Sequence, residues 1–200
     1  MASSQQHLED HRRRLKLLEA DLCAREMRIS AYHDLPFAIY RYDPTLEYEI
    51  RREADLLATR IKNQTGKEVV SISLAELLFQ AVENTVGWES VIQAEREFGF
   101  HKAQETVHQI LSDPNYADLP RMLEERLKPL DPARNIVFLM RAAAMAPALY
   151  HMSKLLEQMQ GRTDVPTIFF YPGALVGVTG LDFMAMGSRD VQGSYRVKIY

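Results

Sequence analysis

Short apolar runs alternate along the chain with longer segments that mix apolar and polar residues. Four of these runs have the length of a strand and contain few polar residues: 37–42, 68–72, 135–140 and 167–171. Runs of this kind are typical of parallel strands that helices cover on both faces. The last run is followed by Pro172 and Gly173, a pair that predicts a turn at the end of that strand.

The segments between the runs have the spacing of amphipathic helices. A helix is predicted over residues 7–28, and a second is predicted from Pro44, with Asp43 as its cap, to about Gly66. Each has one apolar stripe, formed by Leu8, Leu15, Leu18 and Leu22 in the first helix and by Leu46, Ile50, Ala54, Leu57 and Ile61 in the second. Strands that alternate with helices indicate right-handed crossovers and therefore parallel strand pairing.

The rest of the chain continues this pattern. Ser73 and Glu76 have the spacing of a capping box, which opens a helix from residue 74 to about residue 84, and residues 87–130 are helical and charged. Pro147 can begin a helix that runs to Gln160. The tail predicts an antiparallel hairpin of residues 181–186 with 195–200. The predicted fold is α/β: a three-layer sandwich with a mainly parallel sheet and a C-terminal antiparallel hairpin.

Composition narrows the possible functions. The chain has 200 residues, of which 46% are hydrophobic, so it can form one domain with a sizeable core. Its net charge of -3 argues against broad binding to nucleic acid, which requires a basic surface. Its single cysteine, Cys23, cannot form an intrachain disulfide and fits a reducing compartment. We find neither a secretory signal nor a membrane-spanning run in the sequence, and we expect a cytoplasmic protein without a membrane partner.

Motifs for catalysis and cofactor binding are missing from the sequence. The chain has no phosphate loop, and the glycines at 173, 177 and 180 lack the spacing and the position of a dinucleotide-binding loop. His7 and His11 lie one helical turn apart, but a solvated polar face is favoured over a metal site because no third ligand is indicated nearby. Cys23 lies beside Leu22 and is expected to be buried. We therefore expect neither a cofactor nor a catalytic centre.

Two groups of basic residues are candidates for binding a ligand or nucleic acid. The run Arg12, Arg13, Arg14 and Lys16 is balanced by nearby acidic residues, and a solvated helix is favoured over a nucleic-acid contact. Arg41 and Arg141 each follow an apolar strand, so both should emerge at one edge of a parallel sheet. There they can pair with a carboxylate and tie two loops together, or they can accept an anion.

Five segments together resemble the BrxB family of BREX phage-defence systems. They are the early strand with its aromatic residue and proline (37–44), the helix start at 73–78, the apolar strand with a small-residue turn (136–147), residues 170–173, and the final aromatic and basic strand (195–200). Phe170, Tyr171, Pro172 and Gly173 match the family's F-x-P-G signature. The resemblance covers nearly the whole chain and identifies residues 1–200 as one BrxB-like α/β domain. The family looks like a nucleotide-binding sheet without its phosphate loop.

The resemblance implies a small cytoplasmic, antiviral component without catalytic activity, an adaptor that binds other BREX proteins. The implied partners are the phosphatase-like PglZ protein or the large BREX ATPase. The alternatives are a nucleotide-sensing or enzymatic subunit that uses Arg41, Asp43 and Arg141, and a subunit that contacts DNA. The candidate interaction rim consists of Arg41, Tyr42, Asp43, Arg141, Tyr171, Pro172, Gly173 and Leu175. Leu175 follows the signature in an apolar segment, and it is either exposed for a partner or folded onto the core.

Overall fold

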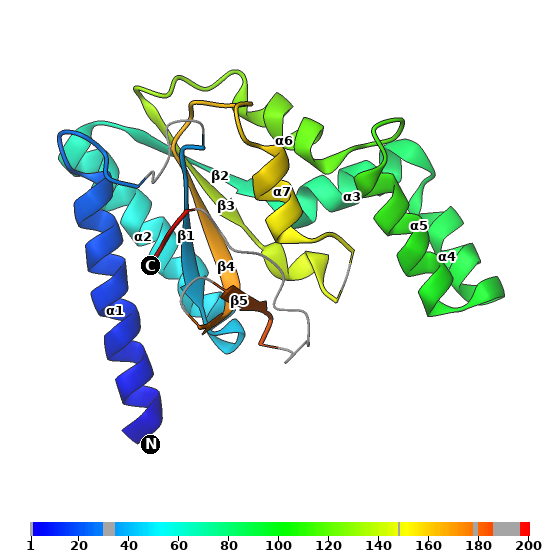
Figure 1. Ribbon diagram of the computed structural model, residues 1–200, viewed down its shortest axis with the longest axis horizontal. Coiled ribbons are helices and arrows are strands. Elements are labelled where there is room, and N and C mark those ends of the chain that lie inside the picture. Colours follow the sequence, from blue (N-terminus) through cyan, green and yellow to red (C-terminus); the bar gives the residue numbers. More distant parts are fainter. Residues whose placement is uncertain (1, 30–34, 148, 178–179, 186–196) are drawn as a thin grey trace.

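Apolar strands pair in parallel through the middle of the molecule (Figure 1). The computed structural model describes residues 2–29, 35–147, 149–177, 180–185 and 197–200. In this part of the chain the strands are β1 (Phe37–Tyr42), β2 (Glu68–Ser73), β3 (Asn135–Met140), β4 (Thr167–Val176), β5 (Gly180–Phe183) and β6 (Lys198–Ile199). Their order is β2-β3-β4-β1-β6, with every neighbouring pair parallel, and β5 joins β4 in antiparallel pairing.

Helices cover both faces of this sheet, which confirms the predicted α/β sandwich. The helices are α1 (Ala2–Leu22), α2 (Glu47–Thr65), α3 (Leu74–Thr85), α4 (Trp88–Phe98), α5 (Phe100–Ser112), α6 (Leu119–Leu127) and α7 (Met152–Gln158), with 3₁₀ turns η1 (Pro44–Leu46) and η2 (Ala142–Met145). Helices α1 and α2 lie on one face, and α3, α6 and α7 lie on the other (Figure 1). Helices α4 and α5 lie side by side and project away from the sheet (Figure 1).

The side chains of each strand alternate between these two layers, as the period of a strand requires. On β4, Phe169 and Tyr171 join the core beneath α3 and α7, whereas Ile168 and Phe170 join the core beneath α1 and α2. All four side chains are at most 1% exposed. The continuous apolar run is therefore explained by burial on both faces.

Local capping follows the sequence closely. The Ser73 hydroxyl accepts the amide of Glu76 (3.2 Å), as the capping-box spacing predicts. Gly66 ends α2 in the left-handed conformation, with φ of 73°. Asp43 does cap the turn that follows β1, but the turn is the 3₁₀ helix η1, and α2 begins only at Glu47.

Two helix boundaries differ from the prediction. Helix α1 ends at Leu22 and not at residue 28, because the chain turns back there and the Arg28 amide donates to the Asp21 carbonyl (3.3 Å). The helix expected from Pro147 begins at Met152. The preceding segment instead forms η2 and turns that bury Met145 and Tyr150 in the core.

The strand ends also differ. Pro172 and Gly173 do not end β4, which continues to Val176 and folds back as β5. Proline is tolerated there because it lies beyond the last β3–β4 partner pair, Leu139 with Phe169, so that ladder needs no donor from it. The antiparallel hairpin is thus β4 with β5, and Lys198–Ile199 pairs in parallel with β1, whose edge it covers. The turn predicted over 187–194 lies outside the described residues.

Candidate functional site at the carboxyl edge of the sheet

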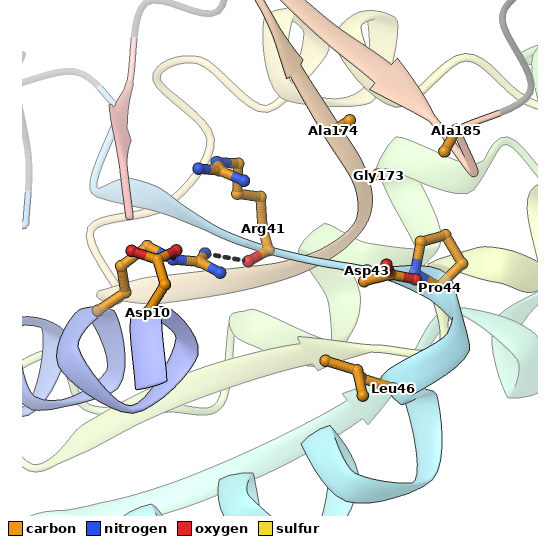
Figure 2. A pocket seen from close by; sticks show the side chains of 9 residues that line it. Asp10, Arg41, Asp43, Pro44, Leu46, Gly173, Ala174 and Ala185 are labelled. Atoms are coloured by element: carbon orange, nitrogen blue, oxygen red, sulfur yellow. Dashed lines mark hydrogen bonds and ion pairs between the residues drawn. The ribbon is translucent and has the colours of Figure 1, made fainter. Parts of the chain in front are cut away.

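The ends of β1 and β4 bring part of the predicted rim together. Arg41 lies opposite Tyr171, and Tyr42 lies opposite Pro172, in a parallel register. A cavity of about 260 Å³ opens at this edge, and Figure 2 shows Arg41, Asp43, Gly173 and Ala174 around it. The carboxyl ends of parallel strands are where α/β proteins commonly bind ligands.

A second cavity of about 360 Å³ is also lined by Arg41. It is lined by residues of α1, β1, the β4–β5 hairpin and the segment of β6 with Tyr200: Arg14, Leu17, Asp21, Arg41, Leu175, Lys198, Ile199 and Tyr200. Arg14 and Arg41 line both cavities. These two arginines are therefore the centre of the candidate site.

Arg14 ties α1 to the edge of the sheet. Its Nη1 donates to the Arg41 carbonyl (2.5 Å), the dashed line of Figure 2, and to the Tyr200 carbonyl (3.2 Å). Its Nε donates to the Asp10 carboxylate (2.9 Å), and its guanidinium lies 5.5 Å from the centre of the Tyr40 ring. Most of the donors of Arg14 are thus used inside the protein, although its positive charge still faces the cavities.

Arg41 is held differently, because its backbone is fixed and its side chain is not. The Arg41 amide donates to the Tyr200 carbonyl (3.2 Å), and its own carbonyl accepts Arg14. Its half-buried guanidinium makes no hydrogen bond or ion pair with another residue that the structure describes. Burial lowers the pKa of Arg41, and the neighbouring Arg14 charge lowers that pKa further.

The carboxylates around the cavities already have partners. Burial alone would raise the pKa of Asp10, but hydrogen bonds and charge from Arg13 and Arg14 outweigh it and keep that pKa low. In Asp21 burial again acts upward, and hydrogen bonds from Lys198 and from Tyr200 (2.7 Å) bring the pKa below its ordinary value. The Asp43 carboxylate accepts the amide (2.9 Å) and the hydroxyl (2.7 Å) of Thr45.

Two of the predicted rim residues are buried. Tyr42 and Tyr171 are each 1% exposed, so neither side chain offers a surface to a partner, as membership of the candidate interaction rim would require. Tyr42 donates its hydroxyl to Glu47, and the Tyr171 ring packs edge-on against Phe169 (5.7 Å) and Phe183 (5.4 Å). The alternation along the strands explains this, because Tyr42 lies on the same face of β1 as the buried Tyr40, and Tyr171 lies on the same face of β4 as the buried Phe169.

Pro172 and Gly173 are buried in the hairpin. The Pro172 carbonyl accepts the amide of Met184 (2.8 Å). A Cβ atom at position 173 would lie 2.2 Å from the Asp182 carbonyl oxygen, so only glycine allows β5 to approach this closely. At the end of the hairpin, where they pair with Leu181 and Gly180, Leu175 and Val176 are 40% and 41% exposed. Leu175 is therefore not folded into the core.

Arg141 follows β3 at the same edge but lines neither cavity. It is exposed and adopts the left-handed conformation, with φ of 60°, where the chain enters η2. The expected grouping of Arg41, Asp43 and Arg141 is thus only partly formed.

Comparisons with known proteins relate the chain to one protein family. A family model described as "BREX protein BrxB" matches residues 70–199. The chain belongs to the BrxB family. A BREX protein BrxB from Bacillus cereus (strain H3081.97) is 23% identical over 165 residues, which cover 82% of this chain and 82% of that protein. No solved structure matches the chain at a significant level.

The segment matched by the BrxB family model contains the whole β4–β5 hairpin and β6 but begins after Arg14 and Arg41. Sequence reasoning assigned Arg14 to a solvated basic run and His11 to a solvated polar face. Both assignments are wrong, since Arg14 is mostly buried and His11 is 3% exposed and hydrogen-bonded to Tyr40. The available signal was their spacing, because positions 11, 14, 15 and 18 share one helical face.

Among the described residues, no group of three or more His, Cys, Asp or Glu side chains is arranged to hold a metal ion. A polar hollow of about 340 Å³ lies instead beside α5, lined by His101, Gln104, Glu105, His108 and His151. Across the same described ranges, no helix is long and apolar enough to span a bilayer.

Proposed function

We propose that this chain is a non-catalytic adaptor of a BREX phage-defence complex and that it holds a second BREX protein at the carboxyl edge of its sheet. Membership of the BrxB family supports a place in a BREX system. The partner that we propose is the phosphatase-like PglZ protein or the large BREX ATPase. The adaptor role itself rests on the surface beside the candidate site.

The observation that carries this proposal is the exposed apolar end of the β4–β5 hairpin. Leu175 and Val176 pair with Leu181 and Gly180 at the end of the hairpin and keep about two fifths of their surface in water. Leu175 also lines the second cavity beside Arg41. An apolar patch next to a partly buried arginine is the composition that protein interfaces favour at their centres.

The substitution Leu175→Asp tests the proposal. An exposed position away from the core tolerates a charge at a cost of roughly 0.5 kcal/mol or less, so the thermal midpoint should stay within a few degrees of the wild-type value. A carboxylate in the centre of an interface is poorly tolerated, and co-purification with PglZ or the large ATPase should be lost. The matched control is Leu56→Asp on the outer face of α2, where Leu56 is 48% exposed. The control should keep the complex.

Two outcomes would contradict this assignment. If Leu175→Asp unfolds the protein, the hairpin end contributes to the core and is not a free surface. If folding and the complex both survive, the interface lies elsewhere, and the aromatic junction of α4 with α5 becomes the next candidate. There Phe98 and Phe100 flank Gly99 and are 70% and 55% exposed. Phe98→Asp would then be the variant that separates the partners.

The DNA-contact alternative receives less support from the contacts of the basic run. Arg14 is used inside the protein, and Arg13 forms an ion pair with Asp10 (2.9 Å). Arg12 and Lys16 are exposed and face solvent. A steep loss of DNA affinity with rising salt would favour this alternative, whereas an adaptor should show weak binding without sequence preference.

A further inference from the structure

Arg41 is the group that the adaptor role does not explain. Its backbone is fixed on both sides by hydrogen bonds to Tyr200 and from Arg14, so the side chain starts from a fixed position. Its guanidinium has five N–H donors, yet none of them donates a hydrogen bond to another described residue. Removing a charge partly from water without giving it a partner costs free energy. Proteins retain such unfavourable features most often at functional sites.

The surroundings of Arg41 increase this cost. The Arg14 guanidinium adds a second positive charge, which disfavours the charged form of Arg41. The Asp10 charge acts the other way on the pKa of Arg41 but does not outweigh burial and Arg14. Asp10 is itself paired with Arg13 and Arg14, and Asp21 is paired with Lys198. Asp43 uses its carboxylate to cap η1. The described part of the site therefore retains positive charge centred on Arg41.

The space around Arg41 suits a small ligand. The cavities of about 260 and 360 Å³ share the two arginines in their linings, and the second lies at the lower end of the size range of small-molecule pockets. Their walls combine the arginines with apolar side chains, namely Leu46 and Ala174 on one side and Leu17 and Leu175 on the other. In Figure 2 the Arg41 side chain points away from Asp43 and Pro44.

We propose that Arg41, reinforced by the charge of Arg14, binds the phosphate or carboxylate group of a small ligand at the carboxyl edge of the sheet. A guanidinium presents parallel donors that match both oxyanions. Arg14 acts as a positioning residue, because it holds the Arg41 carbonyl while its charge adds to the attraction. The inference goes beyond the adaptor function and does not depend on any protein partner.

The test is a titration of the purified full chain with inorganic phosphate at constant ionic strength, followed by amide chemical shifts and by the thermal midpoint. Saturable binding with a Kd on the order of 1 mM is expected for an isolated anion held by about one guanidinium. Arg41→Gln should weaken binding about tenfold or more, and Arg41→Lys should fall between the two because it keeps the charge without the paired donors. The matched control is Arg141→Gln, an exposed arginine at the same sheet edge, and it should leave the Kd unchanged.

Citrate and AMP, titrated in the same way, distinguish carboxylate from phosphate ligands by which binds more tightly. The proposal is overturned if neither phosphate nor citrate saturates the wild type, or if Arg41→Gln and Arg141→Gln respond alike. Loss of the fold does not confuse the result, since Arg41→Gln removes a charge without a partner and should leave the midpoint equal or higher. The titration uses the purified chain without a partner protein, whereas the adaptor role is tested by co-purification, so the adaptor and the anion site can fail independently.

Discussion

The two faces of the sheet are assembled by different means. On the α3–α7 face the contacts are almost entirely apolar, and side-chain hydrogen bonds between elements lie mainly at the surface, such as Arg126 to Gln80 (2.7 Å) and Arg162 to Glu124 (3.1 Å). On the α1–α2 face, polar side chains cross from helix to sheet inside the layer. The Tyr40 hydroxyl is hydrogen-bonded to the His11 ring there, and the Tyr200 hydroxyl donates to the Asp21 carboxylate (2.7 Å).

The apolar contacts of one face mainly stabilise the fold, whereas the hydrogen bonds of the other face fix where its helices lie on the sheet. Apolar burial is not directional and contributes in proportion to the area removed from water, so it can stabilise several arrangements of a helix on a sheet. Hydrogen bonds contribute less on balance but require a particular geometry. The α1–α2 face is the one that borders the candidate site, and there Arg14 and Asp21 fix α1 relative to β1 and β6. The position of α1 on the sheet is therefore fixed most strictly beside Arg14 and Arg41.

The largest effect should come from truncating an aromatic residue on the apolar face. Phe169→Ala removes a fully buried ring beneath α3 and α7 and should lower the free energy of unfolding by about 3–5 kcal/mol, measured by urea denaturation. Phosphate binding by the remaining folded protein should be unchanged. A loss below about 1.5 kcal/mol would mean that this face can collapse around the cavity, and that its packing is looser than the burial indicates.

A smaller effect is expected from one hydroxyl on the polar face. Tyr40→Phe removes the bond to the buried His11, whose Nε2 already has no partner among the described residues, and should cost about 1–3 kcal/mol. Tyr48→Phe is the control, because Tyr48 is 80% exposed on α2 and its change should be close to zero. Equal effects of the two variants would argue against a structural role for the polar contacts of α1.

The smallest effect is a dependence on pH. The folded-state pKa of Asp21 lies below its ordinary value of 3.8, since the bonds from Lys198 and Tyr200 outweigh its burial. A carboxyl group with a lowered pKa stabilises the fold above its unfolded pKa, and this contribution disappears as the pH falls through the folded pKa. Between about pH 5 and pH 3, wild type should therefore lose more stability than Asp21→Asn, as followed by the urea midpoint. Because Lys198 is 40% exposed, solvent screening keeps the difference small. Parallel losses in the two proteins would mean that Asp21 does not hold β6 to α1.

The sheet could be predicted because its signals are local. The four parallel strands lie where the apolar runs place them, and Ser73 begins α3 through its own side chain. The path of β4 through Pro172 could not be predicted, because it depends on β3 ending its pairing at Leu139 and on the space that β5 leaves at Gly173. Both are properties of strands that are distant in the sequence.

The site was predicted only in part, for a related reason. Arg41 and Asp43 follow directly from the rule that parallel strands end at one edge. The contributions of Arg14, Asp21 and Lys198 depend on how α1 and β6 dock against β1, which no short-range pattern reveals. The burial of Tyr42 and Tyr171 was not predicted, because the sequence does not show whether an aromatic residue at a strand end enters the core or stays at the surface.

Because of its position in the sheet, β1 is synthesised long before the strands with which it pairs. Its neighbours are β4 and β6, so Phe37 acquires its partner Thr167 only after about 130 further residues have been made. At about 5–20 residues per second, the apolar β1 waits on the order of ten seconds on the ribosome with both of its edges open. Meanwhile β2 and β3, which are neighbours in the sheet, can pair with each other without it. Both partners of β1 are therefore made late, and β1 needs protection of its open edges while the chain is being made.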